Sequence, residues 1–236
     1  MNESTRLLIH GASGRMGQAL MRLAGERDDL RVVAAAARRA PGDLPAGAQS
    51  ITAASLDAAP DFDVAIDFSL PEAFDPVLDL CVRRGVPLVS GTTGLSDAQR
   101  AALDAAAKTI AVVWAANFSL GVAVLGDLVE RAARALAHWD CDIVESHHVH
   151  KKDAPSGTAL ALGARAEAGG ATPRYASLRA GDIVGEHTVQ FATAGERVEL
   201  IHRATNRDIF ARGALHVARR LHARAPGAYR VADLLD

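Results

Sequence analysis

The sequence predicts an α/β protein with a doubly wound parallel sheet, together with a smaller α+β part that has a mixed or antiparallel sheet. Short apolar runs alternate with helix-like segments through the first half, which is typical of parallel strands covered by helices. A glycine-rich turn follows the first of these runs. Two segments of period two, 187–192 and 197–204, are joined by a short turn containing Gly195 and predict an antiparallel hairpin.

Apolar periodicity locates the elements of the first half. Short apolar runs are expected to be buried strands, and segments with apolar residues at helical spacing are expected to be helices. Ligands of such sheets bind at the carboxyl ends of the strands, so the residues after each run are candidates for a site. The expected strands are 6–10, 31–37, 63–68, 87–90 and 110–114, and the expected helices are 15–26, one beginning at Pro71 and one capped by Ser96 and Asp97 that reaches Lys108.

The second half has a different pattern. An amphipathic helix over 120–136 precedes an extended segment over 142–149, and a further helix begins in the sequence PSGTAL. Small residues over 166–173 predict a mobile loop, and 210–224 predicts a last helix. We expect crossings between two domains near 117–119 and 205–207, which gives a first domain of 1–118 completed by 207–236 and a second domain of 119–206.

Composition narrows the class of protein. A chain of 236 residues with a formal net charge of −2 lacks the basic excess of a general nucleic-acid binder. Cys81 and Cys141 lie far apart without a CxxC pair, so buried thiols in a reducing cytoplasm are expected rather than a disulfide. The N-terminus lacks a signal-peptide pattern and no segment reaches transmembrane length, so we expect a cytoplasmic protein without a membrane partner.

The glycine-rich turn has the spacing GxxGxxG. Ser13 stands where the strict fingerprint has its middle glycine. Gly11 permits the tight turn, Gly14 allows the backbone to approach a pyrophosphate, and Gly17 lets the helix pack closely on the strand. The helix start offers free N–H groups to phosphates. Glycines also mark ordinary turns, but a strand before and a helix after favour a Rossmann-type dinucleotide-binding domain.

The end of the second expected strand bears on cofactor choice. A carboxylate at this place would bind the adenosine ribose, but the strand ends in Ala37, Arg38 and Arg39. Two guanidinium groups can bind a 2′-phosphate, so we predict NADPH as the preferred cofactor and NADH as a second one. The alternative is that both arginines are solvated loop charges.

The stretch 145–160, ESHHVHKKDAPSGTAL, concentrates histidines and lysines. A metal site is disfavoured because His147 and His148 are adjacent on an extended segment and point to opposite faces. A structural or exposed role is assigned to His150. The remaining interpretation is a site for a small anion with proton chemistry, since Lys151 and Lys152 add positive charge and the start of the following helix can bind a carboxylate.

These motifs together resemble the 4-hydroxy-tetrahydrodipicolinate reductase family, long called dihydrodipicolinate reductase. The resemblance rests on GASGRMG, VAIDFS, SGTTG, AANFSLGV, ESHHVHKKDAPSGTAL, RAGDIVGEHTVQFA, GERVELIHRA and NRDIFARGAL, which follow the family's order over nearly the whole chain. It implies reduction by NAD(P)H of a cyclic dicarboxylate imine in diaminopimelate and lysine biosynthesis. It also implies two domains that close over the substrate, and a homotetramer assembled through the sheet of the second domain.

The resemblance assigns roles to individual residues. His147 matches the catalytic proton donor or acceptor, and Lys151 matches a second catalytic group, a proton donor. His148, Gly157 and Thr158 match substrate-binding positions, and no metal ligand is implied. The candidates for cofactor binding, from the turn, the second strand and the resemblance together, are Gly11, Ala12, Ser13, Gly14, Arg15, Met16, Arg38, Arg39, Gly91, Thr92, Thr93, Ala115, Ala116, Asn117, Phe118, Arg207 and Phe210.

Two departures from the family and two other functions are considered. The segment 168–179 is shorter than usual in the family, which bears on assembly, and Ala37 replaces a ribose-binding Glu of some members. A related reductase acting on another small anionic imine or aldehyde is the first alternative function. A nucleotide-sensing module without catalysis is the second, and it would predict a degenerate 145–160 stretch.

Overall fold

The chain is divided into two compact units. The computed structural model describes residues 4–39, 41 and 44–236. One unit comprises Met1–Phe118 and Phe210–Asp236, and the other comprises Ser119–Ile209. The sequence places the second crossing at 205–207 and Arg207 in the first domain, whereas Arg207 lies in the second unit. The crossing falls later because the last helix, α6 (Asp208–Leu221), begins before the chain joins the core of the first unit.

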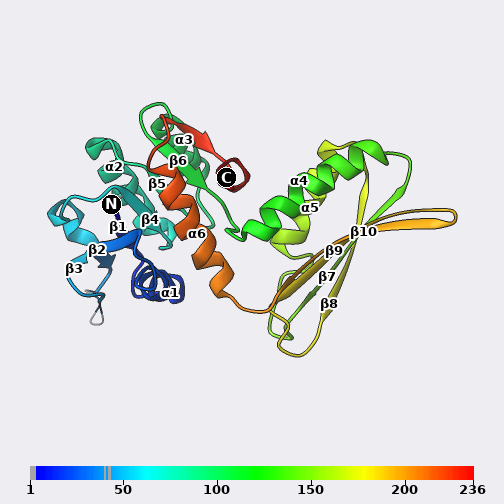
Figure 1. The fold of residues 1–236 in the computed structure, drawn as a ribbon, viewed down its shortest axis with the longest axis horizontal. Helices are drawn as coiled ribbons and strands as arrows, with labels where there is room; N and C mark the ends of the chain where they lie inside the picture. The colour runs from blue at the N-terminus through cyan, green and yellow to red at the C-terminus, as the bar shows by residue number, and fades with distance from the viewer. Residues whose placement is uncertain (1–3, 40, 42–43) are drawn as a thin grey trace. The chain divides into compact units, whose positions relative to one another are not determined.

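A seven-stranded parallel sheet forms the centre of the first unit (Figure 1). Its order is β11-β6-β5-β4-β1-β2-β3, so the chain leaves β1 in one direction and later returns to its other side. This reversal makes β1 and β4 the topological switch point of a doubly wound sheet, as the sequence predicts. The strands are β1 (Thr5–His10), β2 (Leu30–Ala37), β3 (Gln49–Thr52), β4 (Val64–Asp67), β5 (Leu88–Ser90), β6 (Ala111–Trp114) and β11 (Gly227–Tyr229).

Helices α1 (Arg15–Ala24), α2 (Phe74–Arg84), α3 (Asp97–Ala106) and α6 accompany this sheet. A helix was expected to begin at Pro71, but Pro71–Ala73 is a short 3-10 turn and the α-helix begins at Phe74. The cap at Ser96 is confirmed, because the Ser96 hydroxyl accepts from the Gln99 N–H at 3.2 Å. The predicted apolar stripe of α2 is buried in the core, at Phe74, Val77, Leu78 and Cys81.

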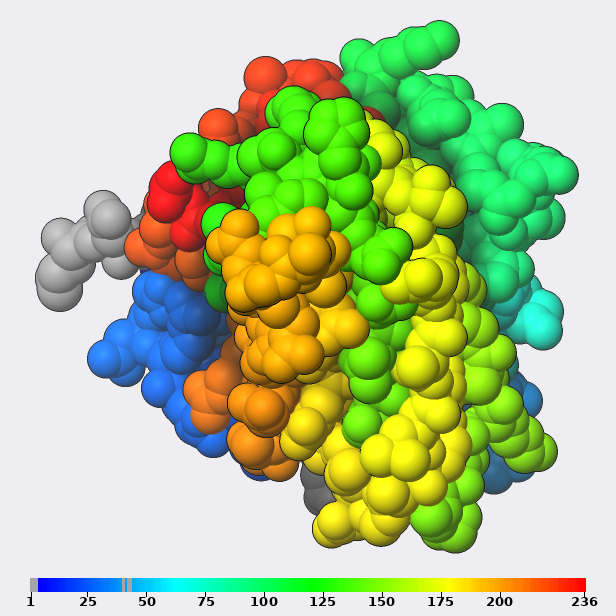
Figure 2. All heavy atoms as spheres, turned by 90° about the vertical axis from the view of Figure 1, so that its right-hand side faces the viewer, coloured from blue at the N-terminus to red at the C-terminus, as the bar shows by residue number. Residues whose placement is uncertain are grey.

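The second unit pairs a four-stranded mixed sheet with two helices. The strand order is β10-β9-β7-β8, with β7 and β8 parallel and the other pairs antiparallel. The core between sheet and helices includes Val129, Ile143, Leu162 and Phe191. The elements are α4 (Leu120–Ala135), β7 (Asp140–His147), α5 (Gly157–Ala168), β8 (Pro173–Arg179), β9 (Gly185–Thr193) and β10 (Glu196–Ala204). The predicted hairpin is β9–β10, whose tip projects from this unit and is orange in Figure 2.

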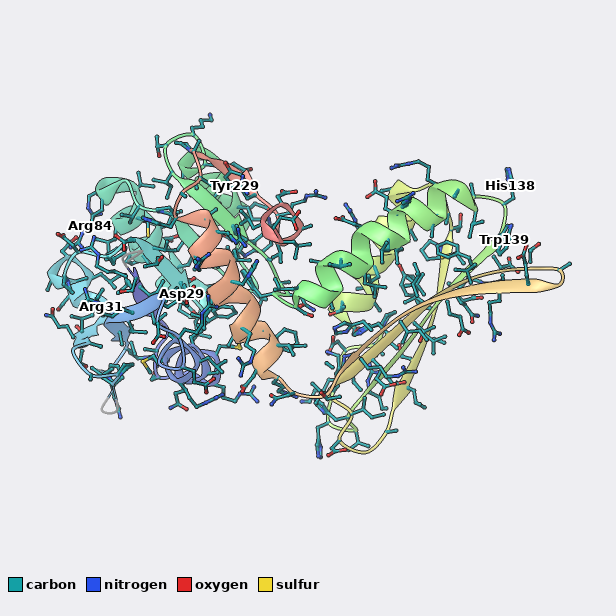
Figure 3. All side chains as sticks on the ribbon, viewed as in Figure 1. Asp29, Arg31, Arg84, His138, Trp139 and Tyr229 are labelled. Atoms are coloured by element: carbon teal, nitrogen blue, oxygen red, sulfur yellow. The ribbon has the colours of Figure 1, made fainter. Side chains whose placement is uncertain are left out.

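Only the middle of the expected loop over 166–173, residues 169–172, lies outside helix and strand. Helix α5 continues to Ala168 and β8 begins at Pro173. The small residues serve packing, because Ala166 and Ala171 are buried in the core. Trp139, between α4 and β7, packs against the same core (Figure 3).

The other side of the second sheet forms an outer face of exposed side chains. Val144 pairs with both Ala176 and Thr188, and Thr188 pairs with Ile201, so these residues make one row across four strands. Val144 and Ile201 are 39% and 41% exposed. We call Val144, Ala176, Thr188, Ile201 and the exposed Leu178 the outer face. None of the helices formed by the described residues is long and apolar enough to span a membrane.

Candidate active site

The glycine-rich turn follows β1 in a conformation that only glycine fits. Gly11 has a φ of +80°, and a Cβ on it would overlap the Phe68 carbonyl. A Cβ on Gly17 would overlap the Gly11 carbonyl, so this glycine lets α1 start close to β1. Gly14 is the N-cap, and no described side chain caps α1. The first N–H groups of the helix can therefore donate hydrogen bonds to phosphate oxygens, and the turn fits a dinucleotide diphosphate.

The other predicted cofactor residues of the first unit follow neighbouring parallel strands. Arg38 and Arg39 are exposed after β2, Gly91–Thr93 follow β5, and Ala115–Phe118 follow β6. They therefore share the carboxyl edge of the sheet with the glycine turn. A hollow of about 920 Å³ adjoins this turn, and Ala12, Ser13, Gln18 and Pro41 are among its lining residues. Phe210 is half-buried on α6 of the same unit.

A buried acid that sequence reasoning missed joins these strand ends. The Asp67 carboxylate, at the end of β4, lies 2.8 Å from His10 Nδ1 and accepts from the hydroxyls of Ser90 at 2.8 Å and Thr92 at 2.7 Å. Burial alone would raise the pKa of Asp67, but the hydrogen bonds from His10, Ser69 and Thr92 outweigh burial and lower it. The ends of β1, β4 and β5 are thus held together by one carboxylate.

The loops after β5 and β6 are also held by aromatic residues. The Trp114 indole N–H donates to the Thr92 carbonyl at 2.8 Å. The rings of Phe68 and Phe118 are tilted, with centroids 5.4 Å apart. Phe68 also packs against Gly91, where a Cβ would overlap its ring. The residues after β5 and β6, which are predicted to contact the nicotinamide side of the cofactor, are therefore held in place by these contacts.

The centre of the second unit's site is Glu145, which no sequence argument selected. Its side chain is fully buried and forms a two-pronged ion pair with Arg179, with distances of 2.8 and 2.9 Å. It also accepts from the Ser156 N–H at 3.2 Å and from Nδ1 of His147. Burial raises the pKa of Glu145, but the hydrogen bonds from Arg179, Ser177 and His147 bring it down to about 2. The spacing Glu-Ser-His could have indicated the contact, since alternate strand residues share a face.

Two histidine rings meet beside this carboxylate. His147, the last residue of β7, packs edge-on against His187 with centroids 5.1 Å apart. His187 Nε2 lies 3.1 Å from the Ser156 hydroxyl, and its buried Nδ1 has no hydrogen-bond partner among the described residues. Burial and the neighbouring His147 lower the pKa of His187 to about 4. His187 is therefore neutral near pH 7. The other ring nitrogen of the pair, Nε2 of His147, lies close to Gly185, where an added Cβ would be 3.0 Å from it.

Lys151 shares a carboxylate neighbour, Asp153, with the predicted substrate residue Gly157. Its ammonium lies 2.9 Å from the Asp153 carboxylate, whose pKa is lowered by Lys151 and also by the N–H of Gly157. Gly157 and Thr158 are the first residues of α5, which Ser156 caps through the Ala159 N–H at 3.2 Å. The Lys151 ammonium and the start of α5 thus both lower the pKa of the same carboxylate.

His148 has a different partner from His147. Its Nε2 lies 3.0 Å from the Arg207 guanidinium, and burial and Arg207 lower the pKa of His148. Arg207, expected to contact the cofactor, is thus joined to a substrate candidate. His150 is exposed, with its ring centroid 6.2 Å from that of His148. Within residues 4–39, 41 and 44–236, no group of His, Cys, Asp and Glu side chains is arranged to hold a metal ion.

Comparison with known proteins identifies the family. The family description "Dihydrodipicolinate reductase, N-terminus" matches residues 5–118, and "Dihydrodipicolinate reductase, C-terminus" matches residues 121–235. The chain belongs to the dihydrodipicolinate reductase family. It is 70% identical to the 4-hydroxy-tetrahydrodipicolinate reductase of Stenotrophomonas maltophilia (strain R551-3), over 100% of both chains. It is 62% identical to the reductase of the same name from Xylella fastidiosa (strain 9a5c), again over 100% of both.

The fold is shared with a solved dihydrodipicolinate reductase. A dipicolinate-bound dihydrodipicolinate reductase from Paenisporosarcina sp. TG-14 superposes with a TM-score of 0.81 at 23% identity, covering 98% of this chain and 100% of that one. Membership confirms the predicted fold class and the reductase role in diaminopimelate and lysine biosynthesis. The chain is an oxidoreductase of a family that uses a nicotinamide cofactor.

Proposed function

We propose that this chain reduces 4-hydroxy-tetrahydrodipicolinate, or its dehydrated form, to tetrahydrodipicolinate with a hydride from NADPH. The observation that carries the substrate side is the contact of Asp153 with Lys151 at 2.9 Å and with the N–H of Gly157. A carboxylate of the protein occupies the place where we expect a carboxylate of the substrate. The name of the relatives from Stenotrophomonas maltophilia and Xylella fastidiosa supports the same substrate.

The protein's own groups provide charge and protons. The reduced nicotinamide, when bound, supplies a hydride to an electron-poor ring carbon. Lys151 or His147 gives a proton to the atom on which negative charge develops, so the dehydrated ring gains one hydride and one proton in total, and the hydroxylated ring in addition loses one molecule of water. His148, Gly157 and Thr158 bind the substrate carboxylates. Lys151 is 22% exposed, which leaves its ammonium accessible to a ligand.

Cofactor choice follows from the end of β2. Ala37 is buried and brings no carboxylate, while the exposed Arg38 and Arg39 bring two positive charges. We therefore propose NADPH as the preferred cofactor and NADH as the weaker one. The glycine turn from Gly11 to Met16 binds the diphosphate, and 91–93 with 115–118 contact the nicotinamide side.

We also propose that the enzyme is a cytoplasmic homo-oligomer, a tetramer by resemblance to the family, that binds neither nucleic acid nor membrane. Support for assembly comes from the outer face, where Val144 and Ile201 expose apolar side chains in one row. Exposed apolar sheet faces of this kind mark contact surfaces. Val144→Glu and Ile201→Glu should give monomers in sedimentation velocity, whereas Val124→Glu, at a position 43% exposed on α4, should not.

The reaction is tested in a coupled assay. A dihydrodipicolinate-forming synthase supplies the cyclic intermediate, and the absorbance of NADPH or NADH is followed. Lys151→Ala and His147→Ala should lose turnover, and the control His150→Ala, at a neighbouring exposed residue, should retain it. Absence of oxidation from a folded wild-type protein that binds NADPH would contradict the proposed substrate.

A further inference from the structure

The buried Glu145 carboxylate determines which nitrogen of His147 carries hydrogen. With a pKa of about 2, Glu145 is ionised at neutral pH and can only accept hydrogen bonds. Its partner on the imidazole is Nδ1. That nitrogen must therefore donate, and Nε2 is left as the nitrogen that takes up or releases a proton. Nε2 faces Gly185, where a Cβ would lie 3.0 Å away.

Arg179 connects this carboxylate to the segment that carries Lys151. Besides its two bonds to Glu145, the guanidinium donates to the main-chain carbonyls of Lys151, at 3.3 Å from Nε, and of Asp153. Glu145 in turn accepts from the Ser156 N–H at the start of α5. One ion pair thus holds the end of β7, the segment 151–153 and the first turn of α5.

Both charges are needed for the arrangement to persist. Arg179 is 18% exposed and Glu145 is fully buried, so removing the guanidinium would leave an uncompensated carboxylate inside the unit. The pKa of Glu145 would then rise, and a protonated carboxyl group could donate to the imidazole. The hydrogen of His147 could move to Nε2, and the segment 151–153 would lose two carbonyl contacts.

We propose that Glu145 and Arg179 are positioning residues for the reaction: they fix the Nδ1–H tautomer of His147 and the main chain that carries Lys151. This inference rests on the proposed function for the roles of His147 and Lys151. Neither Glu145 nor Arg179 needs to contact the substrate for this role. The pair acts through its neighbours, in the manner of residues that orient ligating or catalytic histidines.

The test compares Glu145→Gln, Arg179→Ala and Arg179→Lys with Arg174→Ala. Arg174 is the matched control, because it lies on the same strand β8 and pairs with the partly exposed Asp142 at 2.7 Å. Glutamine keeps the volume of Glu145 but removes its charge and offers an N–H. We expect kcat to fall about 100-fold in Glu145→Gln and Arg179→Ala and less in Arg179→Lys, with Arg174→Ala at the wild-type value.

The direct readout is the tautomer of His147, measured by long-range ¹H–¹⁵N correlation in ¹⁵N-histidine-labelled protein. Wild type should carry the hydrogen on Nδ1 at neutral pH, and Glu145→Gln should shift it toward Nε2. Affinity for NADPH should not change, since the contacts proposed at the glycine turn, the end of β2 and residues 91–93 and 115–118 lie in the other unit. The fluorescence of Trp139 in a Trp114→Phe background, followed through denaturant unfolding, shows whether the second unit of each variant is folded.

An Nε2–H tautomer in the wild type would overturn the proposal, even if a variant failed to fold. Retention of kcat in Glu145→Gln would overturn it too. A wild type that binds NADPH without reducing the cyclic intermediate would instead contradict the proposed function, while the tautomer measurement would still decide whether Glu145 positions His147.

Discussion

His10 and Asp67 form a hydrogen-bonded pair inside the first unit, with Nδ1 and Oδ1 2.8 Å apart and side-chain exposures of 1% and 0%. They belong to neighbouring strands at the switch point of the sheet and are paired in register. The same carboxylate receives the hydroxyls of Ser90 and Thr92. The Asp67 carboxylate therefore stabilises the first unit and also holds the strand ends at which we propose that the nicotinamide binds.

Asp67→Ala should destabilise the first unit by about 3 kcal/mol, because it leaves His10 and two hydroxyls buried without their acceptor. The measurement is denaturant unfolding followed by the fluorescence of Trp114, in a Trp139→Phe background. Asp57→Ala is the control, since Asp57 and its partner Arg83 are 83% and 56% exposed; it should cost less than about 1 kcal/mol. Equal losses for the two variants would contradict the role given to the buried pair.

The second unit should become less stable as the pH falls from about 6.5 to 4. Burial lowers the pKa of His187 from 6.5 to about 4, so in this window the unfolded chain binds a proton that the folded chain does not. The free energy of unfolding should therefore be roughly 3 kcal/mol lower at pH 4 than at pH 7 from this group. Trp139 fluorescence in a Trp114→Phe background reports the transition.

His187→Gln should flatten that slope, and an unchanged slope would rule out His187 as its source. A second loss should follow at lower pH. Glu145 has a folded pKa of about 2 against 4.5 in the unfolded chain, so the stability it contributes is complete above pH 4.5 and lost as the pH falls through 2.

Gly185→Ala should reduce turnover without reducing NADPH affinity. The added Cβ would lie 3.0 Å from His147 Nε2, and the strand and the Glu145 contact leave the ring little room to move. Gly126→Ala on α4 of the same unit is the matched control, because its Cβ would have its nearest neighbour at 3.6 Å. Comparable steady-state rates for both variants would show that Nε2 is not used in the reaction.

Arg38→Ala and Arg39→Ala should each weaken NADPH binding roughly tenfold and leave NADH binding nearly unchanged, because only NADPH carries a 2′-phosphate. Fluorescence titration with both cofactors measures the ratio. Arg31→Ala is the control on the same strand, since Arg31 is exposed on β2 before its carboxyl end (Figure 3). If NADH binding falls as much as NADPH binding, the arginines do not bind the 2′-phosphate.

The sequence predicts the interior of both sheets better than their edges. The strands of the first sheet that carry continuous apolar runs, such as 6–10 and 110–114, are predicted because full burial leaves a local signal. The strands that it misses, β3, β8 and β11, are all edge strands. β8 is mostly exposed and starts with Pro173. An edge strand does not need alternating apolar and polar side chains, and not all of its N–H groups have to donate to a neighbouring strand.

The residues of the candidate site likewise fall into those that the sequence predicts and those that it misses. The glycine turn and the 145–160 stretch are contiguous motifs, so they are visible in the chain. Glu145 and Arg179 are 34 residues apart, and His10 and Asp67 are 57 apart. These pairs depend on strand register, which only the folded sheets establish. His10 ends the expected strand 6–10, and Asp67 is the second-last residue of the expected strand 63–68. These positions were the available signal for the second pair.

The parallel pairing of β7 with β8 sets His147 directly opposite Arg179. Hydrogen bonds along seven paired positions, beginning at Cys141 and Pro173, establish that alignment. Chain added or removed before Pro173 changes the turn after α5 and leaves the alignment as it is. The shortened segment 168–179 retains all seven residues of β8, Pro173–Arg179, so the alignment of His147 with Arg179 is present in this chain despite its shorter segment.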